Sequence, residues 1–302
     1  MPTHLSAEKV HIAWRGDDLT GECPVWDDAG NALWWTDIEG RRLHRLDASS
    51  GAHVVFPTAS RVGSFAPLLD DGFISATEHG FSWLDGRGKL EAITEPERDR
   101  ADNRFNDGCC DRQGRFLAGS MSLTRRAASG SLWSLSPMLE ARELHAGVTV
   151  ANGLAFSPDG ATMWWADSPQ ERVLQFDYEG ENGALRNPRV WLDRGHAPGR
   201  PDGATVDADG AYWSARWQGG AVVRFSAAGK LDLVVELPAQ QVTMCTFGGA
   251  GYKTLFVTTA RNHLDAPALA EQPLAGSVFA IDVGVSGLPP TRFNAHFGGR
   301  PT

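Results

Sequence analysis

Short runs of apolar and β-branched residues alternate with turn signals along the whole chain. The turns are rich in Gly, Asp and Asn and recur about every 8–12 residues, which leaves runs of strand length between them. No long stretch repeats its apolar positions with the 3.6-residue period of an amphipathic helix. The pattern therefore predicts an all-β protein.

Six segments align with one another when they are stacked by their first turn. They begin at residues 22, 65, 106, 152, 202 and 246, between 41 and 50 residues apart. In each, a short run leads into a turn and a second run follows, as in ECPVWDDAGNALWWTD, NGLAFSPDGATMWWAD and DGATVDADGAYWSAR. A third run, such as RRLHRLD at 41–47, and a weaker fourth run, such as AHVVFP at 52–57, complete the unit.

Four strands in a unit of about 40–50 residues are typical of a β-propeller. Six units predict a six-bladed β-propeller, which we expect to form a single domain over residues 1–302. The sixth unit lacks a fourth strand, and KVHIAWR at 9–15 is predicted to supply it and to close the ring. A pair of β-sandwiches is the alternative, but it does not account for the six-fold self-similarity.

Three insertions interrupt the regular spacing, at 121–130, 193–200 and 261–275. We expect these loops to cover one mouth of the central channel. Loops held by a rigid scaffold are where binding specificity usually resides, so we expect them to select the ligand.

The net charge and the apolar content of the chain limit the kinds of molecule that it is expected to bind. The chain of 302 residues carries a net charge of −9, which argues against nucleic acid or an anionic membrane and leaves a small molecule as the expected partner. No apolar run approaches the ~18–20 residues that span a bilayer. The N-terminal MPTHLSAEKV lacks the basic and apolar stretches of a signal peptide. We therefore expect a cytoplasmic protein, either a monomer or a weak homo-oligomer.

The cysteine, histidine and tryptophan positions suggest structural roles. The four cysteines show no CxxC spacing, and adjacent Cys109 and Cys110 would point to opposite faces of a strand, so free thiols are expected. The histidines are scattered without paired spacing, which argues against a histidine-based zinc site. Five tryptophans recur in the second strands and are predicted to pack between blades: Trp34, Trp35, Trp164, Trp165 and Trp213.

The first positions of the six repeats form the candidate site. They are Glu22, Phe65, Asn106, Asn152, Asp202 and Thr246. If the repeats are equivalent, these positions form a ring at one end of the channel. Each of the polar residues alone can instead be read as a turn residue that caps local backbone.

Three members of this ring suit a metal ion. Glu22, Asn152 and Asp202 offer two carboxylates and an amide oxygen, which are hard ligands for Ca²⁺ or Mg²⁺ and tolerate Mn²⁺, Fe²⁺ or Zn²⁺. A carboxylate facing a protein-lined channel is costly unless it is paired or binds a cation. Three protein ligands leave open positions for water and substrate, as in a catalytic site.

Several motifs carry a resemblance to a known family. They are GECPVW, NRFNDG, VANGLAFSPDG, RPDGATVDADG, FGGAGYKTLFVTTA and PLAGSVFAID. In this order, over nearly the whole chain, they resemble the regucalcin/gluconolactonase/luciferin-regenerating enzyme family, also called senescence-marker-protein-like, whose members are six-bladed propellers. The segment TTARNHLDAPALAEQPLAGSVFAID at 258–282 is most similar to bacterial sugar-acid lactonases.

The resemblance implies roles for individual residues. The family's metal-binding Glu, Asn and Asp fall on Glu22, Asn152 and Asp202, with Ca²⁺ as the first expectation for the single divalent ion. The Arg and Asn of its R-x-N-D segment, which contact the sugar, fall on Arg104 and Asn106. The repeats had already singled out Asn106, but Arg104 is implied by the resemblance alone.

The function implied is a carboxylic ester hydrolase, namely a metal-dependent lactonase. The expected substrate is an aldonolactone such as glucono-, xylono-, arabinono- or galactonolactone, and the product is the aldonic acid. Asp202 is expected to be the catalytic residue that moves protons. The alternatives are a non-catalytic calcium-binding or sugar-binding propeller and a protein-interaction propeller, because propellers host many functions.

One loop departs from the animal regucalcins, which carry acidic residues after the second strand of the third repeat. Here the loop reads SMSLTRRAAS, with Arg125 and Arg126. The two arginines either lie solvated or favour a lactone with an anionic substituent, such as a phosphorylated or sulfonated one. Glu78, His79 and His196 are further candidates for substrate contact, whereas Cys23 would point away from Glu22 on an extended strand.

Overall fold

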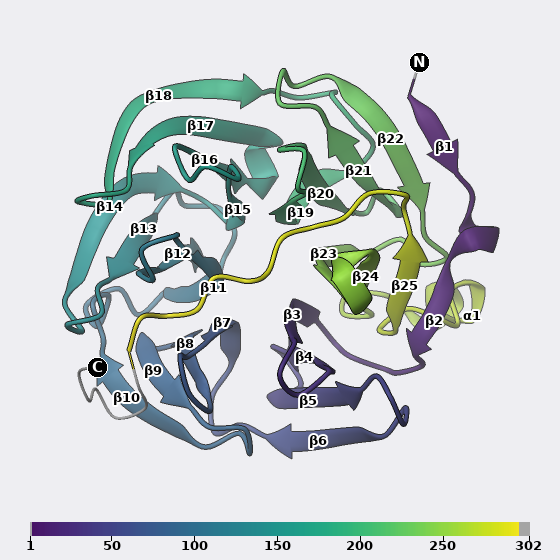
Figure 1. Cartoon of the computed structure of the whole chain (residues 1–302), viewed down its shortest axis with the longest axis horizontal. Helices are drawn as coiled ribbons and strands as arrows, with labels where there is room; N and C mark the ends of the chain where they lie inside the picture. Colours follow the sequence, from purple (N-terminus) through teal and green to yellow (C-terminus); the bar gives the residue numbers. More distant parts are fainter. Residues whose placement is uncertain (1, 296–302) are drawn as a thin grey trace.

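The computed structural model describes residues 2–295, so residues 1 and 296–302 of the predicted 1–302 domain lie outside the described part of the chain. Six sheets, in which antiparallel pairing predominates, stand in a ring around a common centre (Figure 1). In each sheet the first strand lies innermost and the strands follow outward in order, as in a propeller blade. The predicted six-bladed β-propeller is therefore confirmed.

The blades follow one another in chain order. Blade 1 holds β3 (Gly21–Asp27), β4 (Ala32–Asp37), β5 (Arg42–Asp47) and β6 (His53–Pro57); blade 2 holds β7 (Val62–Pro67), β8 (Phe73–Thr77), β9 (Phe81–Leu84) and β10 (Leu90–Thr94); blade 3 holds β11 (Asn103–Cys110), β12 (Phe116–Ser122), β13 (Gly130–Leu135) and β14 (Ala141–Val148). Blade 4 holds β15 (Ala151–Phe156), β16 (Thr162–Asp167), β17 (Arg172–Glu179) and β18 (Ala184–Leu192); blade 5 holds β19 (Arg200–Val206), β20 (Tyr212–Trp217), β21 (Ala221–Phe225) and β22 (Leu231–Glu236); blade 6 holds β23 (Val242–Gly248), β24 (Thr254–Thr259) and β25 (Val278–Asp282).

The N-terminal segment closes the ring. β2 (His11–Trp14) pairs antiparallel with β25 and becomes the outer strand of blade 6, as predicted for residues 9–15. A preceding strand, β1 (Thr3–Leu5), lies parallel to β22 at the edge of blade 5. β1 was not predicted, because three residues are too few to show a period. The first 3₁₀ turn, η1 (Ala7–Lys9), joins the two strands.

Aromatic side chains of the second strands pack between neighbouring blades. Trp34 meets Phe73 of blade 2 edge-on, with ring centroids 5.2 Å apart, and Trp213 meets Phe247 of blade 6 in the same way at 5.6 Å. Trp35, Trp164 and Trp165 are also buried. The five tryptophans therefore form part of the core, as predicted, and fix the blades against one another.

Every innermost strand carries a β-bulge near its start. The pairing register shifts between Glu22 and Val25, between Phe105 and Gly108, between Asn152 and Ala155 and between Pro201 and Ala204. The strands of blades 2 and 6 shift between Val62 and Ser64 and between Val242 and Met244. An extra residue in a strand re-aims the side chains around it, so the bulges direct residues toward the channel.

The segment that follows β25 crosses the middle of the ring (Figure 1). Phe293 donates its backbone N–H to Pro67 O across 2.8 Å, Arg292 Nη1 donates to Leu68 O across 2.7 Å, and Ala208 N donates to Ser286 O across 2.9 Å. The segment thus ties blades 2 and 5 together at the end of the channel where the innermost strands finish.

Short helical turns complete the described chain. α1 (Ala266–Glu271) lies in the insertion at 261–275, where Asp265 caps it by accepting from Ala268 N across 2.9 Å. The 3₁₀ turns η2 (Ser168–Gln170) and η3 (Ala250–Tyr252) follow β16 and β23. No helix within residues 2–295 is long and apolar enough to cross a membrane. All four cysteines are free thiols, as expected.

Candidate active site

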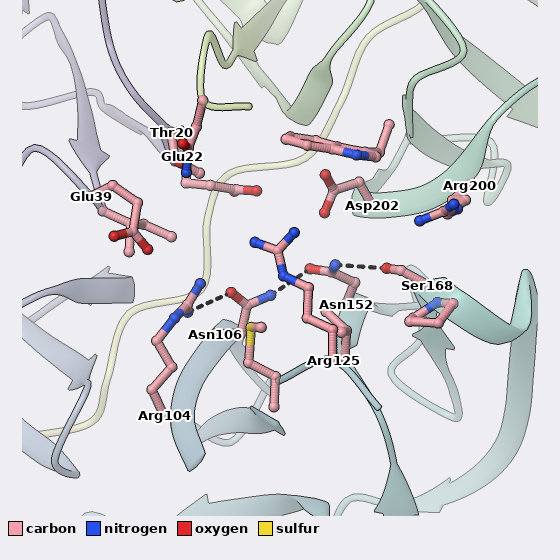
Figure 2. Close-up of a pocket in the computed structure, with 16 residues that line it drawn as sticks. Thr20, Glu22, Glu39, Arg104, Asn106, Arg125, Asn152, Ser168, Arg200 and Asp202 are labelled. Atoms are coloured by element: carbon pink, nitrogen blue, oxygen red, sulfur yellow. Dashed lines mark hydrogen bonds between the residues drawn. The ribbon is translucent and has the colours of Figure 1, made fainter. Parts of the chain in front are cut away.

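A pocket opens at the end of the channel where the innermost strands begin (Figure 2). Glu22, Asn106, Asn152 and Asp202 line it from β3, β11, β15 and β19, that is, from blades 1, 3, 4 and 5. These four residues lie at or beside the β-bulges of their strands, which turn the side chains into the pocket. The structure thus brings together four of the five polar residues that the repeat alignment selected.

Two other members of the predicted ring do not belong to it, and this part of the prediction is wrong. Phe65 and Thr246 line a separate cavity at the opposite end of the innermost strands, beneath the C-terminal segment. The repeats were aligned by their turns, but the stretch between bulge and second strand varies. This stretch runs from Ser64 to Phe73 in blade 2 and from Val25 to Ala32 in blade 1. A residue counted back from the turn therefore lies at a different depth along the channel in the two blades.

A chain of hydrogen bonds links the site residues across three blades. Arg104 Nη1 donates to Asn106 Oδ1 across 2.7 Å, and Asn106 Nδ2 donates to Asn152 Oδ1 across 2.8 Å. Asn152 Nδ2 then donates to Ser168 Oγ across 2.8 Å, and Ser168 Oγ donates to Pro201 O across 2.6 Å. Every donor and acceptor in this chain runs in one direction, so the orientation of both amides is fixed.

Ser168 was missed from the sequence. It opens η2 after β16 and connects the Asn152 amide to the strand that carries Asp202. A serine in a loop carries no signal of its own, because only the packing of blade 4 against blade 5 brings it to Pro201.

Glu22 and Asp202 are carboxylates in a buried setting, each with 7% of its surface exposed. Burial, followed by the charges of Asp202 and Asp107, raises the pKa of Glu22 well above its ordinary value. Burial, followed by the charge of Asp107, likewise raises the pKa of Asp202. Two ionised carboxylates at this depth require a compensating positive charge.

Asp107 is a third carboxylate that sequence reasoning missed. It is buried, with Oδ2 accepting from Leu154 N across 2.9 Å, while no hydrogen-bond partner in residues 2–295 reaches Oδ1. Burial raises the pKa of Asp107 to about 6. Its place directly after Asn106 in NRFNDG was the available signal, because the bulge in β11 turns both residues inward.

The donor set fits a hard divalent cation. Glu22 and Asp202 supply carboxylates whose pKa values stay raised although arginine charges act on them, and Asn152 supplies an amide oxygen whose orientation Asn106 helps to fix. Within the described residues, no group of three or more His, Cys, Asp or Glu side chains is arranged to hold a metal ion. A cation in this pocket would therefore have to use the Asn152 amide oxygen together with the two carboxylates.

Each of the three predicted insertions contributes at least one residue to the lining of the pocket. Arg125, Arg200 and Asn262 all line it, which agrees with the expectation that the three loops surround one mouth. Arg104 lies deeper, with 6% of its surface exposed, and burial lowers its pKa to about 10, so it stays charged at neutral pH. Glu39 lies at the rim and pairs with Arg61 across 2.9 Å.

Other sequence candidates lie elsewhere. Glu78, His79 and His196 are not among the residues that line the pocket, and Glu78 pairs with Arg61 across 2.8 Å. Cys23 Sγ donates to Phe65 O on the neighbouring blade across 3.3 Å, so it points away from the pocket as expected.

Comparison with known proteins gives a family-level match. The model of the SMP-30/Gluconolactonase/LRE-like region matches residues 20–261. A 6-deoxy-6-sulfogluconolactonase of Pseudomonas putida is 38% identical over 93% of this chain and 97% of its own length. Regucalcin of Gallus gallus is 36% identical over 96% of this chain and 99% of its own length.

A solved structure shares the whole architecture. It is that of a calcium-binding protein, regucalcin, from Agrobacterium tumefaciens, which superposes with a TM-score of 0.93 at 29% identity and covers 97% of this chain and 99% of its own. The blade order and the two ends of the channel described above therefore belong to an architecture already known from experiment.

Proposed function

Because the chain belongs to the SMP-30/gluconolactonase/LRE-like family, we propose that it hydrolyses the ring ester of an aldonolactone to the open aldonic acid. The observation that carries this proposal is the convergence of Glu22, Asn106, Asn152 and Asp202 in one pocket. The candidate substrates are glucono-, xylono-, arabinono- and galactonolactone. The name of the Pseudomonas putida relative supports the sugar-lactone class.

Glu22, Asn152 and Asp202 are the proposed ligands of one divalent cation. Ca²⁺ is the first candidate, since all three donors are oxygens and the Agrobacterium tumefaciens regucalcin is a calcium-binding protein. Mg²⁺, Mn²⁺, Fe²⁺ and Zn²⁺ are the other candidates. When bound, such an ion supplies positive charge that stabilises the oxyanion developing on the lactone carbonyl.

Asp202 is the proposed proton carrier. Its carboxylate orients a water molecule and accepts a proton as the water oxygen bonds to the carbonyl carbon. The bond from that carbon to the ring oxygen then breaks, and the proton passes to the ring oxygen, which becomes a hydroxyl. Burial raises the pKa of Asp202, whereas a nearby cation would lower it. With both effects present, Asp202 is a stronger base than a carboxylate that only binds a cation and a weaker base than one that is only buried.

Arg104 and Asn106 are proposed to position the sugar. Arg104 Nη1 donates hydrogen bonds to Phe105 O and Asn106 Oδ1, which fixes the plane of the guanidinium. Its remaining N–H groups are available to the pocket that it lines, where they suit hydroxyl oxygens of the sugar. Orientation of the lactone carbonyl toward Asp202 is the expected result.

A calcium-binding or sugar-binding propeller without catalysis is the second candidate. The Agrobacterium tumefaciens structure favours it, because that regucalcin is named for calcium binding and not for a reaction. Both candidates use the same cation ligands, so only turnover separates them.

The deciding experiment crosses a panel of lactones with a panel of metals. Protein treated with a chelator is supplied with Ca²⁺, Mg²⁺, Mn²⁺, Fe²⁺ or Zn²⁺, and acid release from each lactone is followed with a pH indicator against the spontaneous rate. Hydrolysis above that rate, lost with the chelator and restored by a metal, is the expected result. Metal binding without acceleration of any lactone would overturn the proposal in favour of the non-catalytic propeller.

A further inference from the structure

Two arginines at the mouth of the pocket have no role in the reaction proposed above. Arg125 comes from the insertion at 121–130 and Arg200 begins β19 after the insertion at 193–200. Both are exposed, and both line the pocket that contains Glu22 and Asp202. In Figure 2 the Arg125 guanidinium projects toward the middle of the labelled residues, and Arg200 lies on the Asp202 side.

Neither guanidinium forms an ion pair or a hydrogen bond with another residue of the described chain. Nearby arginines differ in this respect. Arg61 pairs with Glu39 and Glu78, and Arg216 donates to the carbonyls of Pro198 and Gly199. Arg125 and Arg200 are thus cations whose donors remain free for a ligand.

Positive charge exceeds negative charge around the pocket if a divalent cation binds the buried carboxylates. Three arginines line it, Arg104, Arg125 and Arg200, against the carboxylates Glu22, Glu39 and Asp202. Glu39 is already paired with Arg61 from outside the pocket, and a divalent cation would use the charges of Glu22 and Asp202. Among the residues that line the pocket, positive charge would then exceed negative charge, which attracts an anionic ligand.

We propose that Arg125 and Arg200 form a subsite for a phosphate or sulfonate group on the substrate, at the end of the aldonolactone remote from the ring ester. This inference rests on the proposed lactonase function and names its substrate class. The reacting end belongs with Asp202, Arg104 and Asn106, which are buried, whereas Arg125 lies in a loop and Arg200 at the start of β19, and both are exposed. The substrate therefore lies with its anionic end outward.

The chemistry of a tetrahedral anion suits two guanidinium groups that come from different blades. Phosphate and sulfonate each present three oxygens in different directions, and a guanidinium donates along the edges of its planar fork. Arg126, the neighbour of Arg125, is exposed but does not line the pocket, so it serves as a matched control.

The kinetic test compares a neutral lactone with an anionic one. Gluconolactone and 6-phosphogluconolactone are given to the wild type, to Arg125→Ala, to Arg200→Ala, to the double variant and to Arg126→Ala. Loss of each pocket guanidinium should lower the ratio of kcat/KM for the phosphorylated over the neutral lactone by roughly 10- to 100-fold, as expected for a charged hydrogen bond. Arg126→Ala should leave the ratio unchanged, and an unchanged ratio in the double variant would overturn the inference.

A binding measurement separates failure of the subsite from failure of the lactonase proposal. Calorimetry compares the products gluconate and 6-phosphogluconate, which differ only in the phosphate. Tighter binding of 6-phosphogluconate that depends on Arg125 and Arg200 supports the subsite even if no lactone is hydrolysed. Equal affinity for the two products, with hydrolysis of the neutral lactone intact, would overturn the subsite and leave the lactonase function standing.

The two anions are told apart with a third substrate, 6-deoxy-6-sulfogluconolactone. A sulfonate carries one negative charge and a phosphate close to two, so a subsite whose affinity depends only on charge would bind the phosphate more tightly. A higher kcat/KM for the sulfonated lactone would identify sulfonate as the group that the subsite fits. Either preference, if abolished in the double variant, supports the inference, whereas a preference that survives in the double variant contradicts it.

Discussion

The side-chain nitrogen of Asn106 lies 2.8 Å from the side-chain oxygen of Asn152 and donates a hydrogen bond to it. This bond joins the innermost strands of blades 3 and 4 inside the pocket. Because Asn152 Nδ2 is engaged by Ser168, the amide cannot be flipped without losing both bonds. The oxygen proposed to bind the cation is therefore oriented by a residue proposed to bind the sugar.

This relationship predicts the effect of Asn106→Ala. Without the donor, the Asn152 amide keeps only its bond to Ser168 and is less firmly oriented, so the affinity for Ca²⁺ should fall by about 10- to 100-fold, as for other residues that orient metal ligands. Calorimetric titration of the chelated protein with Ca²⁺ measures this directly. Asn182→Ala, on an exposed hairpin of blade 4, is the control and should retain wild-type affinity. An unaltered affinity in Asn106→Ala would show that the bond does not organise the site.

Asp202→Asn should separate catalysis from folding. The amide cannot accept the proton of the attacking water, so kcat is expected to fall by about 10²- to 10⁴-fold. The metal-free variant should nevertheless unfold at a higher temperature than the metal-free wild type, because a buried charge next to Glu22 and Asp107 is removed. Differential scanning calorimetry in the presence of chelator measures this shift.

Two results would contradict the assignment of Asp202. One is turnover near the wild-type rate, and the other is a metal-free variant less stable than the wild type. The control is Asp209→Asn, whose carboxylate is largely exposed in the turn after β19 and should affect neither quantity.

Gly153 follows Asn152 and should not tolerate a side chain. Its φ of 59° lies in the left-handed region, and a Cβ there would come 2.4 Å from the Tyr212 hydroxyl oxygen. That hydroxyl already donates to Gly153 O across 2.8 Å. Gly153→Ala is therefore expected to lower the free energy of unfolding by about 2–4 kcal/mol, from overpacking together with backbone strain.

A matched glycine isolates the steric part of this effect. Gly195 has a φ of 81°, and no neighbouring atom lies within 4 Å of the point that a Cβ would occupy, so Gly195→Ala should cost only the backbone strain. That strain is about 1 kcal/mol. Denaturant unfolding of both variants measures the difference. Equal losses at the two positions would show that the approach of Tyr212 does not constrain the Asn152–Gly153 turn.

A buried pair formed by the segment before β3 and by β5 of blade 1 predicts how stability depends on pH. Asp18 Oδ1 lies 3.3 Å from His44 Nε2, and both side chains are fully buried. Burial, and then the charge of Asp37, raises the pKa of Asp18 to about 8. Burial, and then the neighbouring His53, lowers the pKa of His44 to about 3.

The two shifts act in opposite directions on stability. Folded Asp18 keeps a proton that the unfolded chain loses above about pH 4, so its effect lowers stability as the pH rises toward 8. His44 in the folded protein stays neutral at pH values below about 6.5, at which the unfolded chain binds a proton there. This difference lowers the free energy of unfolding as the pH falls. The effects offset each other between about pH 4 and 6.5, and of the pair only Asp18 still acts between about 6.5 and 8.

Asp18 should therefore lower the free energy of unfolding by up to about 1.4 kcal/mol per pH unit between about pH 6.5 and 8. In Asp18→Asn this contribution to the slope should disappear, because the amide does not titrate. Asp17→Asn is the control, since the side chain of Asp17 is 66% exposed and the variant should keep the wild-type slope. Urea unfolding at several pH values measures both, and a wild-type slope in Asp18→Asn would contradict the raised pKa of Asp18.

Particular residues show how far the sequence could go toward the site. Glu22, Asn106, Asn152 and Asp202 were found because each begins a repeat whose bulge lies at that same position. Arg104 needed the family resemblance, since nothing in its local pattern distinguishes it from a surface arginine. Asp107 and Ser168 needed the structure, because their roles depend on contacts with the strand or blade that follows.

The sequence by itself determined the six blades, the strand that closes the ring, and three of the loops around the mouth. Those features follow from the local alternation of apolar runs and turns, which can be read within each repeat without knowledge of the contacts between blades. The tertiary structure decided how deep each residue sits. The stretch from Ser64 to Phe73 is longer than its counterpart in blade 1, so Phe65 lies at the far end of the channel although its repeat aligns by turn. Depth along a channel is set by the register between strands, and that register exists only once the strands have paired.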